Sequence, residues 1–89
     1  MSFTRYELIP QFDSSQSFYR MAMVSVFDNG LLLRSYGTLV AEIDTETNEV
    51  ELYNYWDASQ TTLRHVKEFL RQNGFKAETK AQIKADYHG

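Results

Sequence analysis

Residues 59–75 read SQTTLRHVKEFLRQNGF, and this stretch predicts the one long helix of the chain. Asp57 or Ser59 is suited to cap its first turn. Gly74 stands where a left-handed residue ends a helix, and Phe75 follows as the apolar contact that often accompanies such an end. Four apolar residues recur at helical spacing and share one face: Leu63, Val66, Phe69 and Leu70. That face needs a sheet to cover it.

The residues before the helix predict strands and turns. Residues 17–28 form the clearest strand, and both of its faces are largely apolar. A strand with one wet face would alternate, so this strand is predicted to be central and covered on both sides. The helix covers one side. The N-terminal segment, the C-terminal tail or a second subunit is expected to cover the other.

Turn signals divide the rest of the chain. Asn29-Gly30 predicts a hairpin with a type I′ turn. Residues 31–44 are long for one strand, so a bulge or bend is expected at Gly37. Residues 44–49 form a polar hairpin loop and residues 50–56 another strand.

Weaker elements are expected at the two ends of the sequence. Residues 6–9 suit an edge strand that ends before Pro10, and the Thr79-x-x-Gln82 pattern predicts a short terminal helix. The predicted fold is α+β: an antiparallel three- to four-stranded meander packed by a C-terminal helix, plus a short terminal helix, in a single domain spanning residues 1–89.

Charge is distributed unevenly along the 89 residues. The net charge of −3 combines −6 over residues 1–58 with +3 over residues 59–89. The absence of cysteine is compatible with a reducing cytoplasm. We find neither an apolar core of signal-peptide length nor a run of membrane-spanning length, so a cytoplasmic location without membrane contact is expected.

Catalytic and metal-binding patterns are weak in this sequence. His65 lies at the edge of the apolar stripe and is predicted to be a surface or boundary residue, with only Glu68 as a nearby carboxylate. The Asp86-x-His88 pair is a poor metal motif. Residues 44–48 lack the glycine and the bidentate glutamate of a calcium loop. We therefore expect no enzymatic activity and no metal or other cofactor.

Six basic residues form the first candidate contact surface. They follow the polar side of the helix and the tail, and are candidate contacts to a partner or to nucleic acid: Arg64, Lys67, Arg71, Lys76, Lys80 and Lys84. The sequence pI of about 5.2 argues against nucleic acid, because binders usually have a high pI. DNA binding therefore ranks second.

Tyr53 and Tyr55 are the candidate protein contacts. They share one side of the strand at residues 50–56, and exposed aromatic residues near a sheet edge suit the docking of a partner or a second copy. A homodimer would also cover the second face of the first strand. The first hypothesis is a non-enzymatic protein-interaction module, and the alternative is a DNA-binding accessory protein that uses the basic helix face and tail.

Four segments resemble a family of small uncharacterised proteins carried by phages, plasmids and integrated elements of Gram-positive bacteria. The segments are SFY (17–19), SYGT (35–38), TTLRHVKEFL (61–70) and QNGF (72–75), and the resemblance spans roughly residues 17–87. Arg20 and Met21 depart from the small and basic residues expected after SFY. The resemblance implies an accessory protein acting inside the host cell on a host or phage protein, or on DNA. It assigns no site residue.

Overall fold

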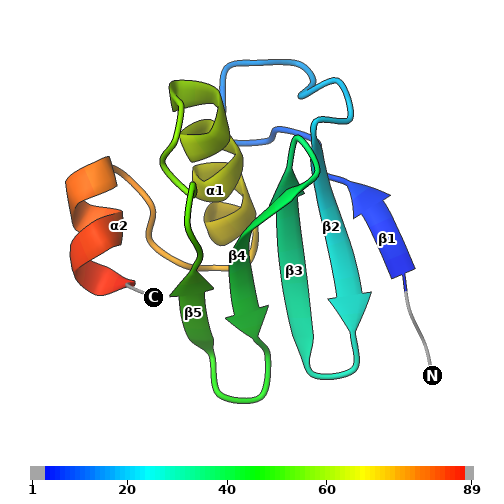
Figure 1. Ribbon diagram of the computed structural model, residues 1–89, viewed down its shortest axis with the longest axis vertical. Helices are drawn as coiled ribbons and strands as arrows, with labels where there is room; N and C mark the ends of the chain where they lie inside the picture. Colours follow the sequence, from blue (N-terminus) through cyan, green and yellow to red (C-terminus); the bar gives the residue numbers. More distant parts are fainter. Residues whose placement is uncertain (1–3, 88–89) are drawn as a thin grey trace.

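The computed structural model describes residues 4–87, which form one antiparallel sheet followed by two helices (Figure 1). The strands lie in chain order, β1-β2-β3-β4-β5, so the sheet is a simple meander. The predicted α+β class is confirmed, with one strand more than the expected maximum. The elements are β1 (Thr4–Glu7), β2 (Ala22–Phe27), β3 (Gly30–Ser35), β4 (Thr38–Asp44), β5 (Glu49–Leu52), α1 (Gln60–Gln72) and α2 (Lys80–Asp86).

The additional strand arises because residues 31–44 form two strands. Ser35 pairs with Thr38 across a two-residue turn, and both turn residues are left-handed, Tyr36 with φ 53° and Gly37 with φ 81°. Two consecutive left-handed residues are typical of a type I′ turn. The prediction of one strand with a bulge or bend at Gly37 was therefore wrong. A register shift does occur, but between Leu33 and Arg34.

Replacing Gly37 with alanine is expected to destabilise the fold by about 1 kcal/mol, because a side chain disfavours the left-handed conformation. A Cβ at this position would meet no atom within 4 Å, so conformational strain is the only expected cost. Urea denaturation of the two proteins measures the difference. An unchanged free energy of unfolding would contradict the assigned turn.

The β2–β3 hairpin forms where it was predicted, but with a different turn. Phe27 pairs with Gly30, so Asp28 and Asn29 make the turn, and neither has a positive φ. The predicted type I′ turn was therefore wrong. Gly30 instead permits close packing, since a Cβ there would lie 3.1 Å from the Ile43 carbonyl oxygen.

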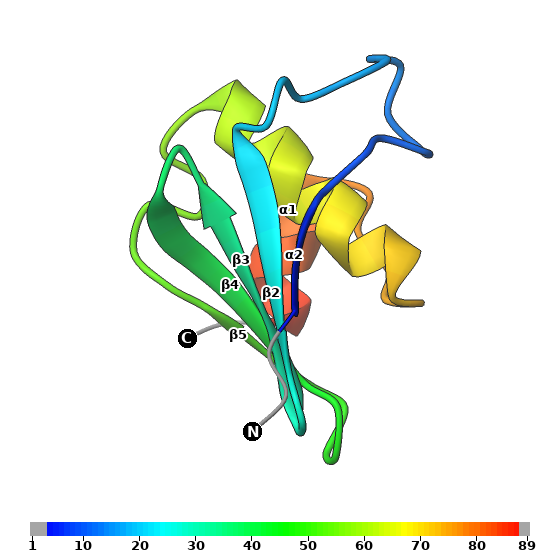
Figure 2. The same cartoon turned by 90° about the vertical axis from the view of Figure 1, so that its right-hand side faces the viewer.

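Strand β2 begins later than predicted and is covered on one face. Tyr19 and Arg20 are left-handed, with φ 54° and 64°, so residues 17–21 cannot continue the strand. Both helices lie on one face of the sheet (Figure 2), and β1 extends the sheet beside β2. The expectation that the N-terminal segment or the tail covers the second face was therefore wrong for the described residues.

The predicted long helix is confirmed as α1. The Ser59 side chain caps it by accepting a hydrogen bond of 3.1 Å from the Thr62 N–H, and Gly74 ends it with φ 85°. The Phe75 N–H then donates to the Leu70 carbonyl at 2.9 Å, as expected for a Schellman end. Helix α2 adds Ile83 to the same core. The fully buried apolar residues of that core include Leu8, Val24, Leu33, Ala41, Val66, Phe69, Leu70 and Ile83.

Candidate functional site

The loop between β1 and β2 is held to α1 by one buried carboxylate. Glu68 is 1% exposed, and its two oxygens accept hydrogen bonds from three successive backbone N–H groups. These come from Gln11 at 2.8 Å, Phe12 at 3.0 Å and Asp13 at 3.0 Å. The Gln72 side-chain amide donates to the same carboxylate at 2.6 Å. Since charged acceptors form the stronger hydrogen bonds, Glu68 fixes the path of this loop.

Arg64 strengthens the same contact from the previous turn of α1. Its guanidinium donates to both oxygens of Asp13, at 3.0 and 2.5 Å, and to the Ser15 hydroxyl. The hydrogen bond from Arg64 holds the pKa of the Asp13 carboxyl well below its usual value. The guanidinium is therefore engaged within the protein.

Two other predicted cationic contacts also have partners within the chain. The Arg71 guanidinium donates to the Ala77 carbonyl at 2.7 Å, and Lys80 lies 3.4 Å from Asp57. The Arg71 contact helps to position the connection between α1 and α2, and the Lys80 contact helps to position α2. Half of the six predicted basic contacts thus contribute to the fold.

The structure does not gather the basic residues on one surface. Lys67 and Arg71 line a small cavity of about 140 Å³ beside Phe12, and Lys76 lines a shallower one with Arg71. Lys84 lies elsewhere, in the cleft between α2 and the β5–α1 connection. The aromatic side chain that accompanies the α1 cations is Phe12, which is 55% exposed, and not Tyr53 or Tyr55.

His65 is fully buried, so its prediction as a surface or boundary residue was wrong. Its Nδ1 lies 2.8 Å from the Ser35 hydroxyl, which is itself 3.2 Å from the Thr62 hydroxyl. The Phe18 ring packs edge-on against the imidazole at 4.4 Å. Nε2 has no hydrogen-bond partner among the described residues. Burial, with a further contribution from the Arg64 charge, lowers the pKa of His65 to about 4, so the ring is neutral near neutral pH.

Two left-handed turns meet close to this buried histidine, whose ring lies 5.8 Å from the Tyr36 ring between centroids. Tyr19 and Arg20 are the central residues of the first turn, which is closed by a 2.9 Å hydrogen bond from the Met21 N–H to the Phe18 carbonyl. Tyr36 belongs to the β3–β4 turn, and its N–H donates to the Met21 carbonyl at 2.8 Å. The two turns therefore form one unit at the upper end of the sheet in Figure 1.

The side chains of these turns are exposed. Tyr19 is 79% exposed, Tyr36 is 57% exposed, and Met21 and Arg20 also face solvent. We call these four residues the aromatic turn surface. Tyrosine, arginine and methionine are enriched in protein interfaces. Three of the four also occupy a backbone conformation that is unfavourable for residues other than glycine.

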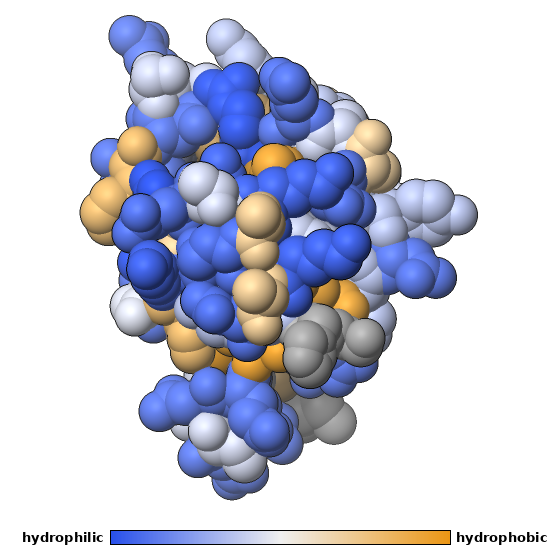
Figure 3. All heavy atoms as spheres, turned by 90° about the vertical axis from the view of Figure 1, so that its left-hand side faces the viewer, coloured by the Kyte–Doolittle hydropathy of each residue, from blue (hydrophilic) through white to orange (hydrophobic). Residues whose placement is uncertain are grey.

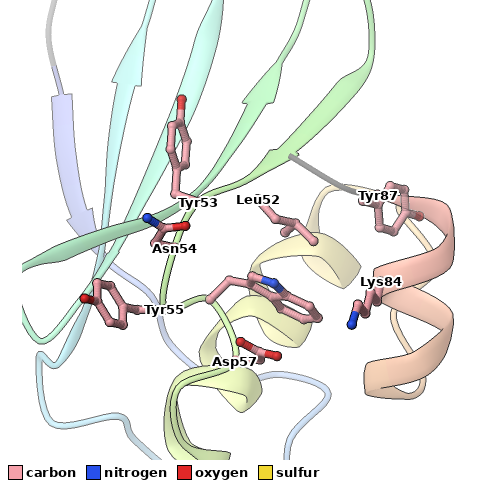
Figure 4. Close-up of a pocket in the computed structure, with 8 residues that line it drawn as sticks. Leu52, Tyr53, Asn54, Tyr55, Asp57, Lys84 and Tyr87 are labelled. Atoms are coloured by element: carbon pink, nitrogen blue, oxygen red, sulfur yellow. The ribbon is translucent and has the colours of Figure 1, made fainter.

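Tyr53 and Tyr55, the predicted protein contacts, lie at the cleft beside α2 but point differently from the prediction. The Tyr53 phenol donates to the Glu42 carboxylate, which raises the pKa of Tyr53 to about 12. Tyr55 is 67% exposed and left-handed, with φ 73°. Both project away from the cleft in Figure 4, whereas Lys84 extends into it from α2. They do not form a paired aromatic surface.

The face that carries α2 is mostly hydrophilic, with scattered apolar residues (Figure 3). Among residues 4–87, no helix has the length and apolar character needed to cross a membrane. The same residues contain no cluster of three or more histidine or acidic side chains that could hold a metal ion. His88, part of the weak Asp86-x-His88 pair, lies outside the described residues.

The fold and the surface define a small α+β domain: a five-stranded meander backed by two helices, with an exposed aromatic unit at one end of the sheet. The chain belongs to a family of unknown function, DUF8033, whose family description matches residues 6–85. The predicted membership of a family without assigned function is confirmed at that level. No curated protein and no solved structure matched the chain in two further comparisons.

The aromatic turn surface could not be predicted from the sequence, and the reason is local. Tyr19 and Arg20 lack the glycine or asparagine that usually marks a left-handed turn. The one signal was Tyr36-Gly37, which was interpreted as a bulge within a single strand. That interpretation left Tyr36 inside the sheet and hid its exposure.

Proposed function

We propose that the protein is a non-enzymatic interaction module that binds a protein partner through its aromatic turn surface. We also propose that it is an accessory product of a phage or plasmid of a Gram-positive bacterium, acts in the cytoplasm and binds a host or phage protein. The four sequence segments that resemble such proteins support this origin. A homodimer is one form that the interaction would take.

The left-handed backbone at Tyr19, Arg20 and Tyr36 is the observation that carries the proposal. Each such residue costs about 1 kcal/mol relative to a relaxed backbone. Glycine or asparagine at these positions would reduce that conformational cost. The tyrosine rings are largely exposed, so the free energy gained by burying them offsets little of it. Conformational strain that holds exposed aromatic rings in place is typical of a binding surface.

The absence of catalytic geometry at the Ser35–His65 pair supports the non-enzymatic part of the proposal. This pair resembles a nucleophile with its base, but Ser35 is 2% exposed and His65 is fully buried. A substrate would have to displace Phe18 or Tyr36 to reach the hydroxyl. The pair is better explained as a polar contact that fixes α1 against β3.

A photo-crosslinking amino acid placed at position 36 tests the proposal. Expressed in the native host, the protein is expected to form one discrete adduct, and the same label at Glu46, an exposed position on the β4–β5 loop, should form none. The adduct should disappear when Tyr19 is also changed. The absence of a position-specific adduct would overturn the proposal.

Tyr19→Asn is expected to raise the free energy of unfolding by about 0.5–1 kcal/mol, because asparagine tolerates the left-handed region and the tyrosine ring buries little surface. The same change should weaken the crosslink from position 36. Thermal denaturation measures the first effect, with Tyr55→Phe, a change outside this surface, as the control. A loss of stability in Tyr19→Asn would contradict the inferred strain.

DNA binding remains the second candidate because Lys67, Arg71 and Lys76 lie near the exposed ring of Phe12. The test is a mobility shift of duplex DNA at low salt, where phosphate contacts are strongest. Lys67→Gln combined with Lys76→Gln should abolish any shift without affecting Arg64 or Arg71, which contribute to the fold. No shift of the unmodified protein would exclude this candidate.

A further inference from the structure

Among residues 4–87, strand β5 has one unpaired edge. It is the last strand of the sheet, and within these residues it pairs only with β4. The Tyr53 N–H donates to the Val40 carbonyl at 3.0 Å, which shows that the odd-numbered residues of β5 direct their backbone groups toward β4. In an antiparallel pair, every second residue directs its N–H and C=O away from the neighbouring strand. For β5 these residues are Val50 and Leu52.

Helix α2 forms a wall opposite this edge. Val50 lines a cavity of about 340 Å³ with Glu49 and Asp86, and Leu52 lines one of about 280 Å³ with Trp56 and Lys84. Tyr87, at the end of α2, lines both cavities, so they adjoin along β5. Figure 4 shows Leu52, Lys84 and Tyr87 around the second cavity.

Tyr87 is held in place by its own contacts. Its hydroxyl donates to the Lys76 carbonyl at 2.9 Å, and its ring packs edge-on against Phe75 with centroids 6.0 Å apart. The groove wall is therefore formed before any ligand binds. A preformed wall reduces the entropic cost of binding.

The charges of the groove differ between its two ends. Glu49 and Asp86 lie at the first cavity and are exposed. The second cavity is lined by Lys84, by the half-buried Trp56 and by Asp57, whose carboxylate pairs with Lys80. The first end therefore favours a lysine or arginine side chain. The second favours an apolar side chain packed on Leu52 and Trp56.

We propose that the groove between β5 and α2 binds an extended peptide segment of a partner protein, which adds to the sheet as a sixth strand. The peptide forms backbone hydrogen bonds with Val50 and Leu52. It carries a basic residue opposite Glu49 and Asp86 and an apolar residue near Trp56. This is the β-strand addition mode of recognition, in which the backbone supplies affinity and alternate side chains supply specificity. The groove is separate from the aromatic turn surface, so the proposal does not depend on that surface.

Selection of displayed random heptapeptides on the full-length protein tests the inference. We expect enriched sequences with a basic residue and, two or more positions away, an apolar residue. On binding of an enriched synthetic peptide, the amide protons of Val50 and Leu52 should become protected from hydrogen exchange. Failure to enrich any peptide, or protection confined to other residues, would overturn the proposal.

Val50→Pro separates backbone pairing from side-chain contact. It removes an N–H that points away from β4, and proline is tolerated on edge strands, so the sheet is expected to remain intact. Peptide affinity should fall about tenfold, the loss of one buried hydrogen bond, while Val50→Thr should retain binding. Equal affinity in both variants would contradict strand addition.

A double charge reversal, Glu49→Lys with Asp86→Lys, provides a test that leaves the β5 backbone unchanged. The double variant should bind peptides with a basic residue more weakly and peptides with an acidic residue more tightly. Unchanged selectivity would overturn the assignment of the acidic end of the groove. Tyr19→Asn should leave peptide affinity unchanged, which distinguishes this groove from the proposed aromatic turn surface.

Sedimentation of the protein alone tests whether a second copy of the chain occupies the groove. A dimer lost in Val50→Pro would show that a second β5 fills the edge and would overturn the proposal.

Discussion

Glu68→Ala is expected to lower the free energy of unfolding by about 3 kcal/mol, because it removes the one acceptor shared by three backbone N–H groups. Gln11, Phe12 and Asp13 donate to this carboxylate, and none of the three N–H groups would keep a charged partner. The loop that carries them also places Leu8, which is fully buried. Loss of the carboxylate therefore weakens both the loop and the core beneath it.

Urea denaturation measures this effect, and two variants bracket it. Glu68→Gln retains one carbonyl oxygen but turns an amide N–H₂ toward backbone donors, so a smaller loss is expected. Glu78→Ala, a change at an exposed glutamate, should alter stability by less than about 0.5 kcal/mol. Hydrogen exchange at Gln11, Phe12 and Asp13 should accelerate in Glu68→Ala alone. Unchanged exchange there would contradict the role assigned to Glu68.

The contrast between α1 and Glu68 shows what the sequence could predict. The helix rests on local patterns, namely the apolar spacing, the Ser59 cap and Gly74, and each was confirmed. The role of Glu68 rests on partners 55 to 57 residues away. Hydrogen bonds at such separations leave no periodic signal, so Glu68 was predicted only as a neighbour of His65.

The basic helix face shows the same limit. The spacing of Arg64, Lys67 and Arg71 correctly predicts that they share the side of α1 away from the apolar stripe. It does not reveal that Asp13 and the Ala77 carbonyl bind two of them. Counting cations along a helix therefore overestimates the charge available to a partner. In the described structure, Lys67 is the one residue of this stripe for which we find no hydrogen bond or ion pair.

The aromatic turn surface escaped prediction for a different reason. Its turns use tyrosine and arginine where sequence rules expect glycine or asparagine. Local preference and the observed conformation disagree at Tyr19, Arg20 and Tyr36. Such disagreements concentrate at functional sites, because binding can maintain a conformation that stability alone would not.

The buried imidazole of His65 should make stability depend on pH. The folded-state pKa is lowered to about 4 from the usual 6.5, so the unfolded chain binds a proton in a range where the folded protein does not. His65 therefore does not lower the free energy of unfolding above about pH 6.5, and it lowers that free energy progressively as the pH falls from 6.5 towards 4. The shift corresponds to a loss of about 3 kcal/mol across that range. Below pH 4 His65 adds no further loss.

Two charged groups near His65, Arg64 and Asp13, also affect the pH dependence of stability, so their contributions must be separated from that of His65. The Arg64 charge disfavours the imidazolium, and Asp13, its ion-pair partner, opposes that effect. Asp13 also has a lowered pKa, so its own contribution is present above its usual value of 3.8 and is lost only as the pH falls below it. The decline between about pH 6.5 and 4.5 is therefore assigned to His65.

Urea denaturation at several pH values across this range tests the assignment, with a variant that cannot titrate. His65→Leu combined with Ser35→Ala removes both partners of the hydrogen bond between these two side chains. The single His65→Leu change would instead leave the buried Ser35 hydroxyl without the imidazole that it contacts, and that loss would add its own cost. The double variant should lose the decline between about pH 6.5 and 4.5 and retain the loss below pH 4 that Asp13 causes. An equal decline in both proteins would show that His65 is not the group that titrates.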